Sequence, residues 1–203
     1  MPTDRLTGLA LFAFVMSITP GPNNLMALTS GANFGFRRTT PHMLGVALGF
    51  AVMAALVGLG VGQTLMRIPL AHEILRWGGL AYMLFLAARL LGLGGAGAGG
   101  QAAGAREGRP MRFAEAAAFQ WVNPKAWVAA LGAVATYVGP GDVAAGALMV
   151  GAVFALVCLP CIAAWGGFGA ALSAWLAAPG RMRLFNTVMA GLLLLSLAPI
   201  VFE

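Results

Sequence analysis

The chain has 203 residues, of which 60% are hydrophobic and only 9% charged. A water-soluble domain of this size cannot bury so much apolar surface in one core, so the composition excludes an ordinary soluble protein and indicates an integral membrane protein. The formal charge of +6 comes largely from arginines in short loops between apolar segments. Because these arginines do not gather on one face, they do not indicate a nucleic-acid-binding surface.

Apolar segments follow one another along the whole chain, each long enough to cross a hydrocarbon layer of roughly 30 Å as a helix. We predict six transmembrane helices, at residues 6–33, 42–63, 74–93, 113–138, 143–168 and 184–202. A glycine- and alanine-rich stretch follows the third helix and predicts a flexible linker. The predicted organisation is a first three-helix repeat (residues 1–93), a cytoplasmic linker (94–112) and a second three-helix repeat (113–203).

The loop arginines predict how the chain is oriented in the membrane, because loops rich in Lys and Arg stay in the cytoplasm. One side of the predicted topology carries Arg37, Arg38, Arg89, Arg106, Arg109, Arg112, Arg181 and Arg183. The other side carries Arg5, Arg67 and Arg76. We therefore expect a multi-pass membrane protein with both termini on the outer side of the membrane.

Two repeats of three helices each must enter the membrane in opposite directions, as the inverted repeats of many secondary transporters do. The predicted fold is thus an all-α membrane protein built from two inverted three-helix repeats. Its first helix contains Pro20, Gly21 and Pro22, and its fourth contains Pro124. Proline removes a backbone hydrogen bond and clashes with the preceding turn, so both helices are expected to be broken near the bilayer midplane.

Asparagines adjoin both predicted breaks: Asn23 and Asn24 follow the first, and Asn123 precedes the second. A new half-helix begins after each break, and its free N–H groups carry a partial positive charge of roughly +0.5. In an inverted repeat both N-termini would face one central site, which suits a single carboxylate. The structural alternative is that the prolines only kink packed helices. We predict a binding site at Pro20, Gly21, Pro22, Asn23, Asn24, Asn123, Pro124 and Lys125.

Lys125 follows the second break directly, inside a predicted span. An ammonium near the bilayer midplane costs at least about 2.5 kcal/mol, so such a residue usually serves function. It could hold the carboxylate of a substrate or carry the proton that couples transport, and a structural pairing is the alternative. His42, near the start of the second predicted span, is expected to be an interfacial residue.

The residues at the two breaks resemble the two hallmark motifs of the LysE/RhtB amino-acid exporter family. They are Thr19-Pro20-Gly21-Pro22-Asn23-Asn24 and Asn123-Pro124-Lys125-Ala126-Trp127. The doubled asparagine is similar to the branch that contains cysteine and O-acetylserine exporters, with threonine and homoserine exporters as neighbours. The resemblance implies a six-helix secondary transporter, not an enzyme, that exports small, neutral amino acids by alternating access.

Three further residues are candidates for the site. Trp121 and Trp127 flank the second break and could wall a cavity, and Asn186 in the last predicted helix could touch substrate or bond across helices. The rival function is a transmembrane thiol-disulfide electron conduit that uses Cys158 and Cys161, which form a CxxC motif. A passive channel is a third alternative.

The expected partners are a small amino acid, the lipid bilayer and a coupling ion, for which we expect the proton. The sequence allows a homo-oligomer as well. Two cysteines inside one apolar segment provide neither a disulfide framework nor a full set of zinc ligands. No metal, cofactor or nucleic acid is expected.

Overall fold

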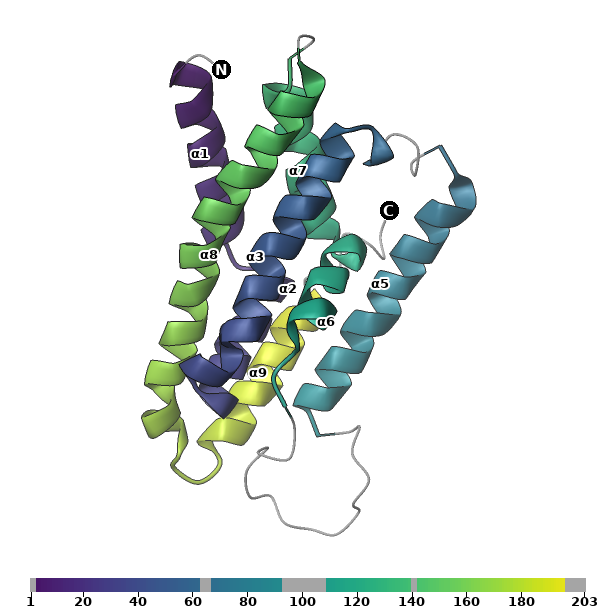
Figure 1. Cartoon of the computed structure of the whole chain (residues 1–203). Coiled ribbons are helices and arrows are strands. Elements are labelled where there is room, and N and C mark those ends of the chain that lie inside the picture. Colours follow the sequence, from purple (N-terminus) through teal and green to yellow (C-terminus); the bar gives the residue numbers. More distant parts are fainter. Residues whose placement is uncertain (1–2, 63–66, 93–108, 140–141, 196–203) are drawn as a thin grey trace.

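The structure is a computed structural model that describes residues 3–62, 67–92, 109–139 and 142–195 (Figure 1). The described elements are all helical, without strands, as the sequence predicts. They are α1 (Thr3–Ile18), α2 (Pro22–Phe34), α3 (Phe36–Gly58), α5 (Pro69–Leu90), α6 (Phe113–Phe119), the 3-10 helix η1 (Gln120–Val122), α7 (Pro124–Tyr137), α8 (Val143–Leu176) and α9 (Arg181–Leu195). Each of the six predicted spans therefore contains at least one helix.

The first and fourth predicted spans are each broken at the prolines. Helix α1 ends at Ile18 and α2 begins at Pro22, while η1 ends at Val122 and α7 begins at Pro124. Proline is favoured at the first position of a helix because its missing N–H would have no partner there. By length and composition, α3 and α8 are the two described helices able to cross a membrane alone; the breaks divide the first and fourth spans into shorter pieces.

Several predicted boundaries differ from the structure by three residues or more, and the largest differences are at the start of α3 and the end of α8. Helix α3 begins at Phe36, about a turn and a half before the predicted start at residue 42, because Gly35 adopts a φ of +81° and turns the chain sharply between α2 and α3. Helix α8 continues to Leu176 with Pro160 inside it. Because α3 starts earlier than predicted, His42 lies inside this helix. It is buried, so the prediction of an interfacial histidine was wrong.

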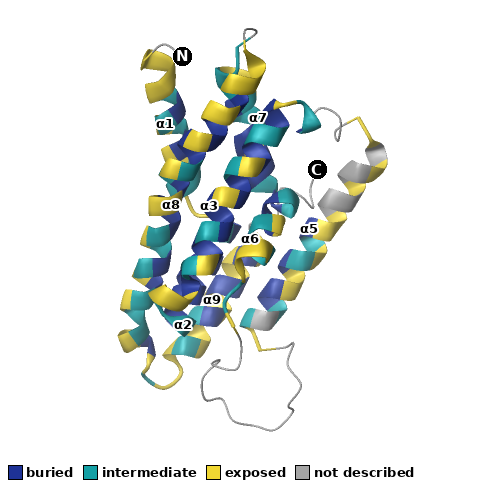
Figure 2. Ribbon diagram, in the orientation of Figure 1, coloured by how far each residue is buried: buried dark blue, intermediate teal, exposed yellow. Residues whose placement is uncertain are grey.

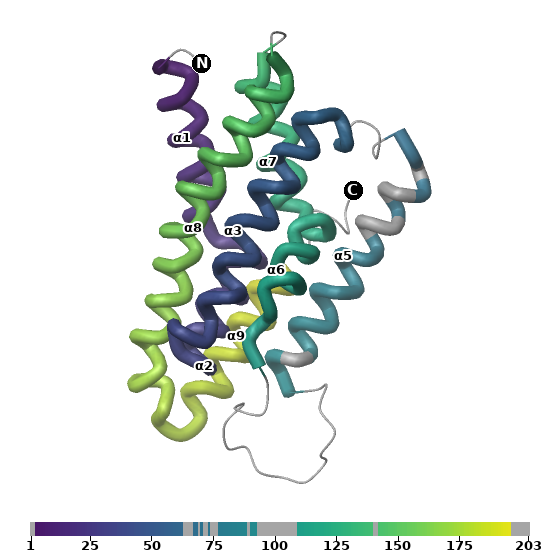
Figure 3. The backbone as a smooth tube through the Cα atoms, in the orientation of Figure 1, coloured from purple at the N-terminus to yellow at the C-terminus, as the bar shows by residue number. Residues whose placement is uncertain are grey.

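Helices of the two halves run in opposite directions (Figure 3). The path through α1 and α2 leads from the end of the bundle that holds the N-terminus to the opposite end, and the path through α6, η1 and α7 leads back. Helices α3 and α8 are antiparallel, and so are α5 and α9. We refer to the end where α2 turns into α3 as the Gly35 end, and to the end where α8 begins as the Asp142 end.

Glycines allow α2 and α8 to touch backbone to backbone in the centre of the bundle. A Cβ atom at Gly169 would lie 1.9 Å from the carbonyl oxygen of Leu28, and one at Gly31 would lie 2.0 Å from that of Gly166. The buried residues line the inner faces of these helices, whereas the outer faces are exposed and largely apolar (Figure 2). An apolar exterior around a packed core suits a lipid environment.

Because α8 and α2 are in close contact, two glycine substitutions are predicted to differ strongly in their effect on the folding free energy. Gly169→Ala is expected to cost about 1–3 kcal/mol of folding free energy, because its methyl group overlaps rigid backbone. Gly191→Ala is the matched control, since no atom lies within 4 Å of its added Cβ. Thermal unfolding of the purified protein in detergent should show a lower midpoint for Gly169→Ala alone. Equal midpoints for the two variants would contradict this packing.

Candidate functional site

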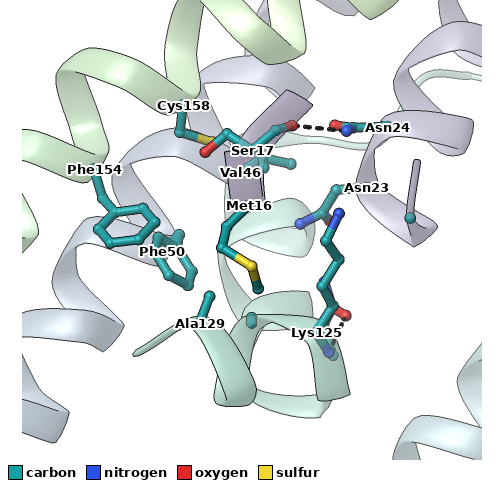
Figure 4. A pocket seen from close by; sticks show the side chains of 13 residues that line it. Met16, Ser17, Asn23, Asn24, Val46, Phe50, Lys125, Ala129, Phe154 and Cys158 are labelled. Carbon is teal, nitrogen blue, oxygen red and sulfur yellow. Dashed lines mark hydrogen bonds between the residues drawn. The ribbon is translucent and has the colours of Figure 1, made fainter. Parts of the chain in front are cut away.

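A small cavity lies where the two breaks meet (Figure 4). Its lining comes from α1, α2, α3, α7, α8 and the two breaks: Met16, Ser17, Gly21, Asn23, Asn24, Val46, Phe50, Asn123, Lys125, Ala126, Ala129, Phe154 and Cys158. About 50 Å³ of it is open to the centre of a water molecule, which is room for a few water-sized groups. The five predicted site residues Gly21, Asn23, Asn24, Asn123 and Lys125 are thus brought together.

Side chains from three helices satisfy the carbonyl groups that the first break leaves open at the end of α1. The Asn24 side-chain amide donates to the carbonyl oxygens of Ser17 and Thr19, each at 2.8 Å. The Trp165 indole, from α8, donates to the carbonyl of Ile18 at 3.0 Å. These bonds meet the requirement that broken backbone inside a membrane protein be paired within the protein.

Lys125, from the start of α7, completes this set. Its ammonium donates to the carbonyl and hydroxyl oxygens of Thr19 at 2.6 and 2.9 Å, and to the carbonyl of Pro20 at 3.3 Å. The C-terminus of a helix carries partial negative charge, so a cation is stabilised there. Lys125 therefore joins the second break to the first. Its ammonium thus lies against the two residues that directly follow α1, an arrangement that sequence reasoning did not foresee.

Gly21 lies where the Lys125 side chain passes. A Cβ atom at position 21 would lie 2.7 Å from Cδ of Lys125. Gly21 is also the N-cap residue of α2, and it offers no side chain to cap that helix. Because Pro22 has no N–H, the first amide groups of α2 belong to Asn23 and Asn24, beside the cavity.

The two half-helix N-termini are not equivalent. At α7 the side-chain oxygen of Asn123 accepts a hydrogen bond from the Lys125 backbone N–H at 3.2 Å, so this helix is capped by its own asparagine. At α2 no side chain makes such a bond. The positive end of α2 is thus the one left open to an anion.

A reciprocal amide pair links the two breaks. The Asn23 amide donates to the side-chain oxygen of Gln120 at 2.8 Å, and the Gln120 amide donates back to Asn23 at 3.3 Å and to the carbonyl of Ala116 at 2.7 Å. Gln120 is completely buried. It was not among the predicted site residues, although a glutamine four residues before Pro124 inside an apolar segment was a visible signal.

The opposite wall of the cavity is apolar. In Figure 4 Phe50 and Phe154 lie across the cavity from Asn23 and Lys125, with Met16 between them. The two phenylalanine rings have their centroids 4.7 Å apart. Ser17 and Cys158 add a hydroxyl and a thiol, and no acidic side chain is among the lining residues. This wall suits a small side chain without a positive charge.

The remaining predicted residues lie outside the lining. Asn186 accepts a hydrogen bond from Asn33 at 3.2 Å, so it joins α9 to α2. The Trp127 indole donates to the carbonyl of Trp121 at 2.8 Å, and the two rings pack edge to face beside the second break. Pro20, Pro22 and Pro124 shape the breaks. Cys158 and Cys161 are both free thiols, and Cys158 alone of the two lines the cavity.

Comparison with known proteins identifies the family of the chain. The model of the LysE type translocator family matches residues 14–201. Among curated proteins, the cysteine/O-acetylserine efflux protein of Escherichia coli K12 is 33% identical over 141 residues, which cover 69% of each chain. Its counterpart in Shigella flexneri is 33% identical over 136 residues, or 66% of each chain. No solved structure matches. The chain therefore belongs to the LysE type translocators, a family of membrane proteins for amino-acid efflux and not of enzymes.

Proposed function

We propose that the protein is a secondary transporter that exports small, neutral amino acids of the cysteine/O-acetylserine or threonine/homoserine type across the bacterial inner membrane. The observation that carries the proposal is the cavity between the two breaks. It combines an uncapped helix N-terminus, a fixed ammonium and an apolar wall in one small volume. The first two features suit the carboxylate of an amino acid, and the third suits a small apolar side chain.

The substrate carboxylate would bind at the N-terminus of α2. The N–H groups of Asn23 and Asn24 are available there, and the partial positive charge of the helix end favours an anion. The Lys125 side chain runs past Gly21, the N-cap of the same helix, and adds positive potential. In the proposed complex Lys125 holds α1 in place and the carboxylate neutralises the opposing end of α2.

The substrate side chain would face Met16, Val46, Phe50 and Phe154. A basic side chain would bring a second cation into this space, and no carboxylate lines it to act as a counter-ion. An unpaired charge buried in an apolar site costs several kcal/mol, so lysine and arginine are disfavoured as substrates. Ser17 and Cys158 can hydrogen-bond a hydroxyl or thiol of the substrate.

Transport would proceed by alternating access, with residues 1–93 and 113–203 rocking around the cavity. The opposite directions of α3 and α8, and of α5 and α9, support a pair of inverted repeats. The Gly35 end would face the cytoplasm, since Arg37, Arg38 and Arg181 lie there. Both termini would then be periplasmic, and the proton is the proposed coupling ion.

Counterflow in proteoliposomes tests this function directly. Vesicles are loaded with unlabelled cysteine, O-acetylserine, threonine, homoserine or lysine, and uptake of the labelled compound is followed. Transient accumulation with a small neutral amino acid, and none with lysine, is the expected result. Absence of counterflow with every neutral compound, from protein shown to be folded, would overturn the proposal.

The thiol-conduit alternative predicts that both cysteines are essential. The exporter predicts the opposite, because Cys161 does not line the cavity and Cys158 contributes only part of one wall. The double variant Cys158→Ala, Cys161→Ala should therefore retain counterflow of its substrate.

A further inference from the structure

His42 is buried in the middle of the bundle without a hydrogen-bond partner. Its residue is 1% exposed, and neither Nδ1 nor Nε2 has a partner among the described residues. A neutral imidazole carries both a donor and an acceptor, and leaving such groups unpaired costs about 1–3 kcal/mol each. A residue kept at this cost calls for a reason other than packing.

The face of α3 that carries His42 lies against α6. Residues three, four and seven positions apart share one face of a helix, so His42 lies on the stripe of Gly45 and Gly49. A Cβ atom at Gly45 would lie 2.3 Å from the carbonyl oxygen of Phe113, and one at Gly49 would lie 2.5 Å from Cα of Ala117. His42 is therefore one turn from a close contact between the first and second halves of the chain.

His42 also lies between the cavity and the Gly35 end. Val46, one turn further along α3, lines the cavity. Thr39, one turn in the other direction, is fully buried; its hydroxyl donates to the carbonyl of Gly35 at 2.9 Å and is 2.9 Å from the hydroxyl of Ser30. The imidazole and the two hydroxyls are therefore buried polar groups between the cavity and this end, although no hydrogen bond joins the imidazole to the hydroxyls.

The helices packed against α3 offer His42 no counter-ion among the described residues. Glu115, on α6, accepts hydrogen bonds from the Arg109 side chain and from the Arg112 backbone. On α7, Lys125 is bonded to Thr19 and Pro20. Helix α8 contributes only the thiols Cys158 and Cys161, α2 contributes no ionisable side chain, and α3 itself adds Arg37 and Arg38 at its exposed start. An imidazolium enclosed here would be an unpaired buried charge, which is strongly disfavoured.

We propose that His42 is the residue that binds and releases the coupling proton. This inference rests on the proposed function of the protein as a carrier. While α3 is packed on α6, as in this structure, the imidazole is neutral. When the contact opens during transport, water reaches the ring and one proton binds to its free nitrogen; as the contact closes, the ring releases the proton to water towards the Gly35 end. Each cycle moves one proton and leaves the histidine unchanged.

The test separates coupling from binding. His42→Gln and His42→Asn keep a polar side chain that cannot titrate, and Met43→Leu, at the adjacent buried position, is the matched control. In proteoliposomes we expect both His42 variants to retain counterflow, which needs no ion gradient, and to lose accumulation driven by a pH gradient. Met43→Leu should retain both activities. Gradient-driven accumulation in a folded His42 variant would overturn the proposal. Loss of both counterflow and gradient-driven accumulation in a folded variant would overturn it as well.

A measurement on the protein with His42 intact covers the case in which neither variant folds. Diethylpyrocarbonate modifies accessible neutral imidazoles, and mass spectrometry locates the product; a His72→Gln background leaves His42 as the single histidine. We expect little modification at rest and clear modification during pH-gradient-driven transport. Equal protection in both conditions would overturn the proposal. Absence of wild-type counterflow, in contrast, would refute the carrier function itself.

Discussion

Lys125→Met should strongly slow substrate transport while the protein remains folded. Methionine is similar in length to the lysine chain and fills the same space beside Gly21, but it cannot donate to the oxygens of Thr19 and Pro20. Hydrogen bonds to a charged group contribute about 1.5–3 kcal/mol, so losing the ammonium should slow transport by roughly tenfold to a hundredfold or more. The rate of counterflow, compared at equal amounts of reconstituted protein, measures the effect.

Lys125→Arg serves as the matched control for charge. It retains the cation, yet its planar fork cannot place three donors on the end of α1 in the same way. We expect transport intermediate between wild type and Lys125→Met. Wild-type rates in Lys125→Met would contradict the role of the ammonium, whereas an equal loss in both variants would show that position matters as much as charge.

The positions of the breaks could be predicted from the sequence, because their cause is local. Proline cannot donate a backbone hydrogen bond wherever it stands, so Pro22 and Pro124 mark helix starts in the sequence as clearly as in the structure. Asn123 caps its own helix two residues on, which is also a local effect. These local signals predict the two breaks and five of the residues that line the cavity, Gly21, Asn23, Asn24, Asn123 and Lys125.

The partners of these residues could not be predicted, because they depend on how distant helices meet. Asn23 and Gln120 are 97 positions apart, and Lys125 and Thr19 are 106 apart. A hydropathy pattern shows that Gln120 is polar in an apolar segment, but not which residue it faces. The environment of His42 was mispredicted for a different reason: the turn at Gly35 starts α3 six residues earlier than the apolar pattern does, so His42 lies inside the helix and not at its end.

The size of the cavity gives the second prediction with a large expected effect. Ala129 lines the cavity and is 4% exposed, while the adjacent Val128 is 65% exposed on the outer face of α7. Ala129→Leu adds three carbon atoms to a space in which about 50 Å³ is open to the centre of a water molecule. Overfilling a packed site costs about 1–3 kcal/mol, which corresponds to roughly a tenfold to hundredfold loss of affinity.

This loss should depend on the size of the substrate. O-acetylserine carries an acetyl group that cysteine lacks, so Ala129→Leu should reduce counterflow of O-acetylserine more than that of cysteine. Val128→Leu, on the lipid-facing side of the same helix turn, should leave the ratio of the two rates unchanged. Because both variants introduce the same side chain one residue apart, an altered ratio in Ala129→Leu alone would show that selection by size takes place at this wall. An equal reduction for both substrates would instead place the substrate side chain away from Ala129 and leave the Ser17 and Cys158 side of the cavity to receive it.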